Sequence, residues 1–489
     1  MSSRNRAVQG HFIGGQWRGS ATGETYADRS PWDSSLVATV AAGTGEDARE
    51  AIEVAHAAFA GWSATGPGAR QEVLLRAATE LASRREAALL LLARETGCGA
   101  YFGNVQVDFA LSMLRQAAAL PYAAYGQLIP SDLAGTQAMA LRRPVGVVGA
   151  IAPWNAALIL SGRAIVAPIA LGNTVVLKPS EESPLAGGAL WAEIFSAAGL
   201  PPGVLNVVTH APGEAGTVGS ELIANPLVRR LSFTGSTSIG RRLAEAAGSH
   251  LKRMVLQVSG HNPLIVLAGV DLDYAVDAAA YGAFVHQGEV CMCVRRILVE
   301  RSIAEAFTQR LVRKVSALPM GDPRDPRTVI GPLINEWALA LVTRRVAEAV
   351  QLGAHVLVGG TPAAPCYPPT VLTGVPPEAE LYFDETFGPV VIVEVVGDAE
   401  DAVARANASR FGLAAGVLAG TPEHGMEIAL RLQAGLVHVN DQPVNDEPQM
   451  PFGGLKDSGW GRFGVGAAVE EFCETQWVSS RTTRRTFPF

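Results

Sequence analysis

The sequence predicts an α/β protein with two doubly wound parallel sheets. Short β-branched runs, among them PVGVVGAIAP, GNTVVLKPS and VRRLSFTGS, alternate with helical segments in the middle of the chain. A second series, from NPLIVL to LVHVN, follows and is interleaved with helical segments at 302–317 and 334–352. Strands that alternate with helices favour parallel sheets. Two separate series therefore indicate two α/β domains.

Composition narrows the class of protein. The chain has 489 residues, more than one simple core accommodates, with 48% hydrophobic and 17% charged residues, as in a globular enzyme. A net charge of −7 gives no basic surface for nucleic acid or for an anionic membrane. The five cysteines are scattered, which predicts neither a disulfide framework nor a metal site.

The N-terminal and apolar segments bear on location. The start, MSSRNRAVQGHFIGG, has no apolar signal region, and the longest apolar tract, VGVVGAIAPWNAALIL, is interrupted by Pro153, Trp154 and Asn155. A membrane span needs about 20 mostly apolar residues. We therefore expect a cytoplasmic protein without a membrane partner.

The other elements follow from local patterns, in chain order. HFIGGQWRGS alternates around two glycines and predicts a hairpin. Helical periodicity predicts helices over 45–63, 68–96 and near 104–125, the second as one long amphipathic helix. The end of the chain, TQWVSSRTTRRTFPF, is typical of a strand with basic, exposed ends.

Two loops that follow strands carry polar side chains suited to chemistry. In APWNAAL, the amide of Asn155 can stabilise an oxyanion or cap the next helix. In LKPSE, Lys178 and Glu181 can bind the ribose of a dinucleotide or belong to a solvated loop. A carboxylate binds a free 2′-hydroxyl and repels a 2′-phosphate, so this pair favours NAD over NADP.

Four further motifs complete the set. FTGSTSIG carries Gly235 and Ser236 into a helix N-terminus suited to pyrophosphate. GEVCMC offers Cys291 as a nucleophile, although a buried structural cysteine fits the same pattern. DETFGPVV places Glu385 for a second ribose, and MPFGGLKDSGWGRFG contains Phe452. Ordinary turn chemistry also accounts for these last two.

The order and spacing of the motifs resemble the aldehyde dehydrogenase superfamily. APWN, LKPSE, FTGST, a glycine turn, Gly-x-x-Cys, ETFGPV and PFGG succeed one another between about residue 10 and the C-terminus. The segments IAPWNAALILSGRAI and FVHQGEVCM are most similar to the branch that acts on vanillin, benzaldehyde and salicylaldehyde. This resemblance implies a NAD-binding domain (1–120 and 140–255), a catalytic cysteine domain (256–438) and an oligomerisation or bridging element (121–139 and 439–489).

The resemblance also implies roles. Cys291 would be the nucleophile, with Asn155 and the Cys291 backbone N–H binding the oxyanion. The cofactor, expected to be NAD rather than NADP, would contact Trp154, Lys178, Glu181, Gly235, Ser236, Glu385 and Phe387. An aromatic aldehyde would occupy a pocket formed by Ala156, Ile159, Leu160, Arg163 and Phe452. For Arg163, a surface or subunit salt bridge is the slightly favoured alternative. A homodimer or homotetramer is expected, paired through the tail strand.

One position departs from the family pattern. Gln257 stands where the family has the Glu that activates water, 34 residues before Cys291. Phe463 replaces a second acidic position that some members have. Three hypotheses follow: hydrolysis of a Cys291 thioester by another route, transfer of the acyl group to a thiol or amine, or a catalytically impaired binding or assembly protein, including one altered to trap the acyl-enzyme. A missing base slows a reaction by about 10²–10⁴-fold, so release of the acyl group is the step in question.

Overall fold

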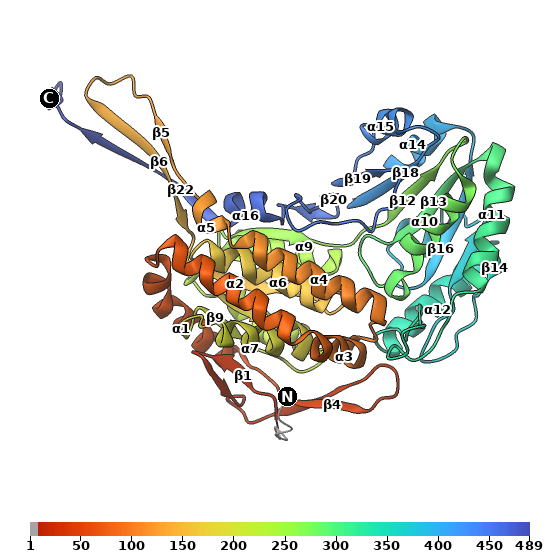
Figure 1. Cartoon of the computed structure of the whole chain (residues 1–489), viewed down its shortest axis with the longest axis horizontal. Helices are drawn as coiled ribbons and strands as arrows, with labels where there is room; N and C mark the ends of the chain where they lie inside the picture. The colour runs from red at the N-terminus through yellow and green to blue at the C-terminus, as the bar shows by residue number, and fades with distance from the viewer. Residues whose placement is uncertain (1–7) are drawn as a thin grey trace.

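A computed structural model describes residues 8–489 and contains two large sheets beside one another (Figure 1). The first sheet has eight strands in the order β2-β1-β9-β8-β7-β10-β11-β21. Its central strands, from β9 to β11, run parallel, and the strands at its edges are antiparallel. The strands are β1 His11–Ile13, β2 Gln16–Arg18, β7 Val147–Ile151, β8 Thr174–Lys178, β9 Leu205–Val207, β10 Val228–Thr234, β11 Arg253–Gln257 and β21 Gly459–Trp460.

Helices cover both faces of this sheet, which explains why its central strand β7 is apolar and buried at every position. Val148 and Ala150 of β7 pack into a core with one set of helices, whereas Val147 and Ile151 pack into a core on the opposite face. The first face holds α2 Pro67–Ser83, α4 Ala100–Ala117, α6 Ala157–Ala170 and α7 Leu190–Ala197; the second holds α1 Gly45–Ser63, α8 Ala215–Ala224 and α9 Thr237–Ser249.

The prediction of one helix over 68–96 was wrong. The segment forms α2 and a separate helix, α3 Arg85–Thr96, because Arg84 leaves the helical conformation at φ −104° and ψ 11°. Helical periodicity continues across this break, so the sequence pattern gives no sign of it.

The second sheet has seven strands in the order β14-β15-β16-β13-β12-β18-β19, parallel except for β14. The strands are β12 Asn262–Val266, β13 Val294–Glu300, β14 His355–Val358, β15 Thr370–Thr373, β16 Val390–Val396, β18 Ala414–Leu418 and β19 Leu436–Val439. Its helices are α10 Leu272–Phe284, α11 Arg301–Ser316, α12 Glu336–Gln351, α14 Ala399–Asn407 and α15 Pro422–Ala429. Helices α10 and α11 cover one face and the others cover the opposite face. The two sheets confirm the predicted fold class.

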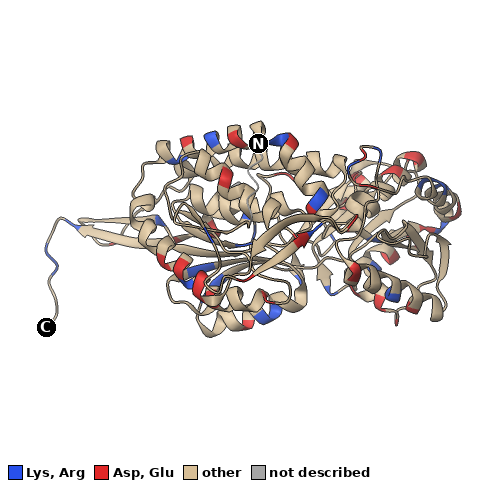
Figure 2. Cartoon of the chain, turned by 90° about the horizontal axis from the view of Figure 1, so that it is seen from below, with Lys and Arg blue, Asp and Glu red and all other residues tan. Residues whose placement is uncertain are grey.

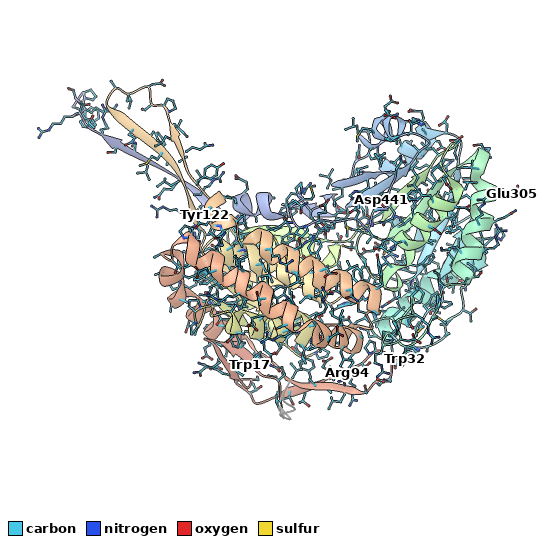
Figure 3. The ribbon with its side chains drawn as sticks, viewed as in Figure 1. Trp17, Trp32, Arg94, Tyr122, Glu305 and Asp441 are labelled. Atoms are coloured by element: carbon cyan, nitrogen blue, oxygen red, sulfur yellow. The ribbon has the colours of Figure 1, made fainter. Side chains whose placement is uncertain are left out.

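A third, small sheet projects from the body as an arm (Figure 1). It consists of β5 Gln127–Ile129, β6 Thr136–Pro144 and β22 Cys473–Arg481. Strand β22 pairs antiparallel with β6 over its whole length. Tyr122, at the foot of the arm, is labelled in Figure 3. Before it enters the arm as β22, the C-terminal segment forms β21, which pairs antiparallel with β11 at the edge of the first sheet.

The surface carries charges of both signs. Lys and Arg residues (blue) and Asp and Glu residues (red) are interspersed along the ribbon in Figure 2. None of the described helices combines the length and apolar character needed to cross a bilayer.

Candidate active site

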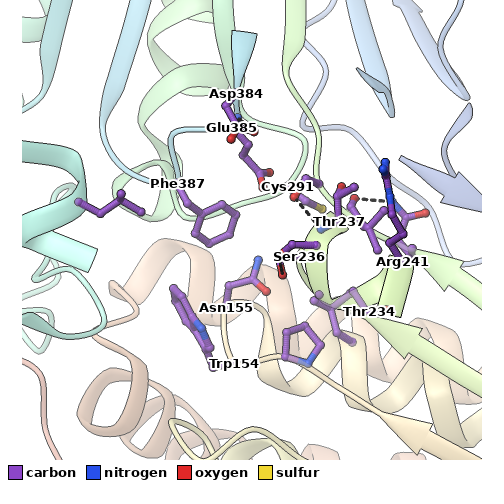
Figure 4. Close-up of a pocket in the computed structure, with 18 of the residues that line it drawn as sticks. Trp154, Asn155, Thr234, Ser236, Thr237, Arg241, Cys291, Asp384, Glu385 and Phe387 are labelled. Carbon is purple, nitrogen blue, oxygen red and sulfur yellow. Dashed lines mark hydrogen bonds between the residues drawn. The ribbon is translucent and has the colours of Figure 1, made fainter. Parts of the chain in front are cut away.

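The candidate active site is a cavity of about 680 Å³ lined by loops of both large sheets (Figure 4). The loops that follow β7 and β10 contribute Trp154 and Ser236, and the last residue of β11 contributes the side chain of Gln257. The second domain contributes Cys291 and Glu385 from the opposite side. Such a position, at the carboxyl ends of parallel strands, is where open α/β sheets bind ligands.

The loop that presents Cys291 is tightly constrained. After α10 the chain turns through His286 and the next residue with positive φ angles of 50° and 43°. Gly288 follows at φ 73°, and a Cβ added there would lie 2.2 Å from the carbonyl oxygen of Gly388. Arg295 donates hydrogen bonds to the carbonyls of Gly288 and Gly388. These contacts place the thiol at the cavity rather than in the core.

The backbone of Cys291 is held from the start of β12. Asn262 donates from Nδ2 to the carbonyl oxygens of Cys291, at 2.8 Å, and Cys293, at 2.9 Å. A Cβ added to Gly260 would lie 2.5 Å from the Cys291 carbonyl oxygen. Only glycine fits there, so the turn after Gln257 packs directly against the backbone of Cys291.

Asn155 lies between β7 and α6 and is buried. Its Nδ2 donates to the backbone carbonyl of Glu289 at 3.0 Å. A side-chain amide has two N–H donors, so one remains for an oxyanion. Residue Ala156, not Asn155, is the N-cap of α6, so the alternative of a helix cap does not apply.

The surroundings of Cys291 strongly disfavour deprotonation of its thiol. Burial, and next the Glu385 carboxylate, raise the pKa of Cys291 to about 12, against a smaller lowering by the Arg163 guanidinium. Cys291 is therefore a thiol at neutral pH unless a ligand or a proton acceptor changes its surroundings.

Gln257 ends β11 and is 1% exposed. Its Nε2 makes a 3.4 Å hydrogen bond to the Val258 carbonyl oxygen. No donor of the described chain reaches its Oε1. The residue therefore lines the cavity, while its Oε1 is itself buried and has no hydrogen-bond donor in the described chain.

Glu385 extends from the loop before β16 toward Cys291 (Figure 4). Its Oε1 accepts from the Gly260 backbone N–H at 3.1 Å. Burial raises the pKa of Glu385, while hydrogen bonds from the Ser259 side chain and Gly260 act in the opposite direction. The carboxyl group is thus anchored beside Cys291.

The part of the cavity lined by the N-terminus of α9 suits the phosphates of a dinucleotide. Ser236 is the N-cap of α9, accepting from the Ile239 N–H at 3.4 Å, and this helix N-terminus faces the cavity with Gly235. Backbone N–H groups there favour an anion. Trp154 and Phe387 meet edge to face, with ring centroids 5.7 Å apart.

Lys178 and Glu181, which were expected to contact the cofactor, do not line this cavity. Lys178 Nζ is 2.5 Å from Nε2 of His210, whose ring lies 3.6 Å from the Glu181 carboxylate. Burial lowers the pKa of Lys178 to about 8. Burial and the Lys178 charge lower the pKa of His210 to about 4, so the pair carries one positive charge. Sequence reasoning missed His210, which stands in none of the motifs.

The residues expected around an aryl group divide into two sets. Leu160 lines the cavity, whereas Ala156 and Ile159 are buried in the adjoining core. Arg163 stacks over Phe452 at 4.0 Å, and its guanidinium is paired with a carboxylate.

That carboxylate belongs to Asp446, and both side chains of the pair are almost fully buried. The prediction of a surface or subunit salt bridge for Arg163 was therefore wrong, because the ion pair is internal. The guanidinium carbon of Arg163 also lies 5.0 Å from the centroid of the Phe109 ring. Sequence reasoning singled out neither Asp446 nor Phe109.

Several further residues that sequence reasoning did not single out also line the cavity. Thr237 and Ser259 lie near the helix N-terminus, and α12 contributes Trp337, Leu341 and Arg345. Within residues 8–489, no three His, Cys, Asp or Glu side chains are grouped closely enough to hold a metal ion. The expected absence of a metal stays a prediction.

A cysteine and an amide in a cavity that ends at a helix N-terminus between two α/β domains define a dinucleotide-dependent oxidoreductase. A sequence profile described as the aldehyde dehydrogenase family matches residues 17–478. The chain belongs to the aldehyde dehydrogenase family, whose members use NAD or NADP.

Known relatives agree with this assignment. A vanillin dehydrogenase of Pseudomonas fluorescens is 43% identical over 98% of both chains. A benzaldehyde dehydrogenase [NAD(+)] of Pseudomonas putida is 41% identical over 94% of both. The crystal structure of a salicylaldehyde dehydrogenase from Pseudomonas putida G7, complexed with salicylaldehyde, superposes with a TM-score of 0.96 at 35% identity, covering 99% of this chain and all of the other.

Proposed function

We propose that this protein oxidises aromatic aldehydes to carboxylic acids with NAD, through a thioester on Cys291. The observation that carries the proposal is the shared cavity of Cys291, Asn155 and the N-terminus of α9. The names of the relatives support an aromatic substrate. Leu160, one of the residues expected around such a ring, lines the cavity.

The chain's own residues divide the work. Cys291 sulfur attacks the aldehyde carbon, and Asn155 donates its second N–H to the oxyanion. Nicotinamide, when bound, accepts the hydride. Ser236 and the N-terminus of α9 hold the pyrophosphate, and Glu385 with Phe387 holds the nicotinamide ribose. Glu181 beside Lys178 favours a ribose with a free 2′-hydroxyl, hence NAD.

Gln257 favours a second candidate function, because an amide takes up no proton at neutral pH and so cannot act as the base for hydrolysis. The acyl group would then pass to a thiol or amine, or stay on the enzyme. Mixing protein, NAD and a panel of benzaldehydes, with NADH and acid measured separately, tests this. Steady formation of both supports the proposal. An NADH burst that continues only with added thiol or amine supports transfer, and no NADH from wild-type protein overturns oxidation. Cys291→Ala is the control and should give no NADH.

A further inference from the structure

The release of the acyl group needs a proton acceptor, and Gln257 is not one. Among the described residues that line the cavity, the carboxylates are Asp384 and Glu385. We propose that Glu385 is the general base that activates water for hydrolysis of the Cys291 thioester, a role that rests on the function proposed above.

The two carboxylates differ in their surroundings, and the difference favours Glu385 as the base. Asp384 is paired with Arg410 at 2.9 Å and Arg345 at 3.3 Å, and its side chain is 31% exposed. Glu385 makes no ion pair within residues 8–489 and turns its carboxyl group toward Cys291 (Figure 4). Of the two, only Glu385 is both near the sulfur and unneutralised by a direct cationic partner.

A short path fixes Glu385 relative to the thioester. Its Oε1 accepts from Gly260 N–H, and Gly260 is in contact with the carbonyl of Cys291. The carboxylate also affects the Cys291 thiol electrostatically, more than any other charged group does. Burial raises the pKa of Glu385 toward the range in which a general base works well near neutral pH.

Gln257 gains a role in this arrangement. Its amide lines the same cavity, and no donor of the described chain satisfies its Oε1. That oxygen is itself buried, so we infer that a small rotation of the Gln257 side chain brings it to the cavity. There it accepts one hydrogen of a water molecule while Glu385 accepts the other. Gln257 would then be a positioning residue, orienting the water without taking its proton.

Hydrolysis of the Cys291 thioester transfers one proton from water to Glu385. The water oxygen bonds to the thioester carbon as its proton moves to the Glu385 carboxylate. Asn155 stabilises the oxyanion, which collapses and breaks the carbon–sulfur bond. The products are the carboxylic acid, the Cys291 thiolate and a protonated Glu385. A proton then returns from Glu385 to the sulfur or to solvent.

Because Glu385 is also assigned to the nicotinamide ribose, the test acylates Cys291 without cofactor. An activated ester, p-nitrophenyl benzoate, transfers its acyl group directly to a thiol and releases p-nitrophenolate. Wild-type protein should show a burst followed by steady turnover. Glu385→Gln should keep the burst and lose steady turnover by about 10²–10⁴-fold. Intact mass spectrometry should then find the benzoyl group retained.

Two further variants make the result decisive. Asp384→Asn, the adjacent carboxylate, should keep steady turnover. Gln257→Glu added to Glu385→Gln should restore hydrolysis, because it returns a carboxylate to the same cavity. Wild-type turnover by Glu385→Gln, or an equal loss in Asp384→Asn, overturns the proposal. The ester assay involves no hydride transfer, so failure of this inference is distinguishable from failure of the oxidation itself.

Discussion

After burial, the Glu385 carboxylate is the group that most raises the pKa of the Cys291 thiol, to about 12. The residue proposed to complete the reaction thus opposes the ionisation that begins it. The relationship is consistent with a base placed close to the sulfur, where its negative charge unavoidably disfavours a thiolate.

This relationship predicts that Glu385→Gln has a more reactive Cys291 thiol although it hydrolyses the thioester more slowly. Glu385→Gln removes the negative charge, so the pKa of Cys291 should fall, and alkylation by iodoacetamide should be faster at neutral pH. The pH profile of the alkylation rate, measured without cofactor, should move to lower pH. Asp384→Asn is the control and should move it less. A purely structural role for Glu385 predicts no such shift, and an unchanged profile would contradict the electrostatic argument.

The buried pair of Arg163 and Asp446 should be costly to break. Arg163→Met leaves Asp446 buried without its partner, which should lower the free energy of unfolding by about 3–5 kcal/mol. Urea denaturation measures this change. Arg163→Met combined with Asp446→Leu should recover much of the loss, because no charge then stays buried. A double variant as unstable as the single one would show that packing on Phe452, rather than the ion pair, dominates.

The same pair shows where sequence reasoning reaches its limit. Apolar runs buried on both faces predicted the parallel sheets, and motifs predicted Cys291, Asn155 and Ser236 at one cavity. Arg163 and Asp446 are 283 positions apart, and no local pattern links them. The contact of Lys178 with His210 likewise arises only when neighbouring strands align. Local periodicity encodes faces and ends of elements, whereas partners across the fold depend on packing.

Glu289 makes stability dependent on pH. Burial raises its pKa to about 8, well above that of a carboxyl group in the unfolded chain. The folded state therefore retains a proton that the unfolded state releases. The stabilisation is fully present below the unfolded pKa and is lost as pH rises through about 8, by at most about 1.4 kcal/mol per pH unit.

Glu289→Gln should remove this dependence. The amide mimics the protonated acid, and Gln287, whose Oε1 has no donor in the described chain, can accept from it. Thermal denaturation at pH 5.5 and 8.5 should show a variant close to wild type at the lower pH and more stable at the higher. Parallel pH profiles for the two proteins would mean that Glu289 does not hold the proton.

Cofactor choice should depend on Glu181. Its carboxylate lies 3.6 Å from the His210 ring and repels a 2′-phosphate, while Lys178 supplies a positive charge nearby. Glu181→Gln should therefore raise the affinity for NADP more than that for NAD. Titration of protein fluorescence with each dinucleotide gives both dissociation constants. Equal changes for the two cofactors would remove Glu181 from the selection.

The arm should hold subunits together. Both of its faces carry exposed apolar side chains, with Trp477 78% exposed on β22 and Leu128 70% exposed on β5. Each edge strand also has unpaired backbone groups, because β6 lies between β22 and β5. Exposed apolar surface of this kind marks an interaction site. A homodimer or homotetramer joined through the arm would bury it.

Trp477→Glu places a charge on that surface and should shift the protein toward a mass near 51.2 kDa, that of one chain, in size-exclusion chromatography with light scattering. Leu251→Glu is the matched control, since Leu251 is 94% exposed and lies on the body rather than the arm. The control should keep the mass of the wild type, because its charge meets solvent in either state. If Trp477→Glu also keeps that mass, or if wild-type protein has the mass of a single chain, the arm does not join subunits.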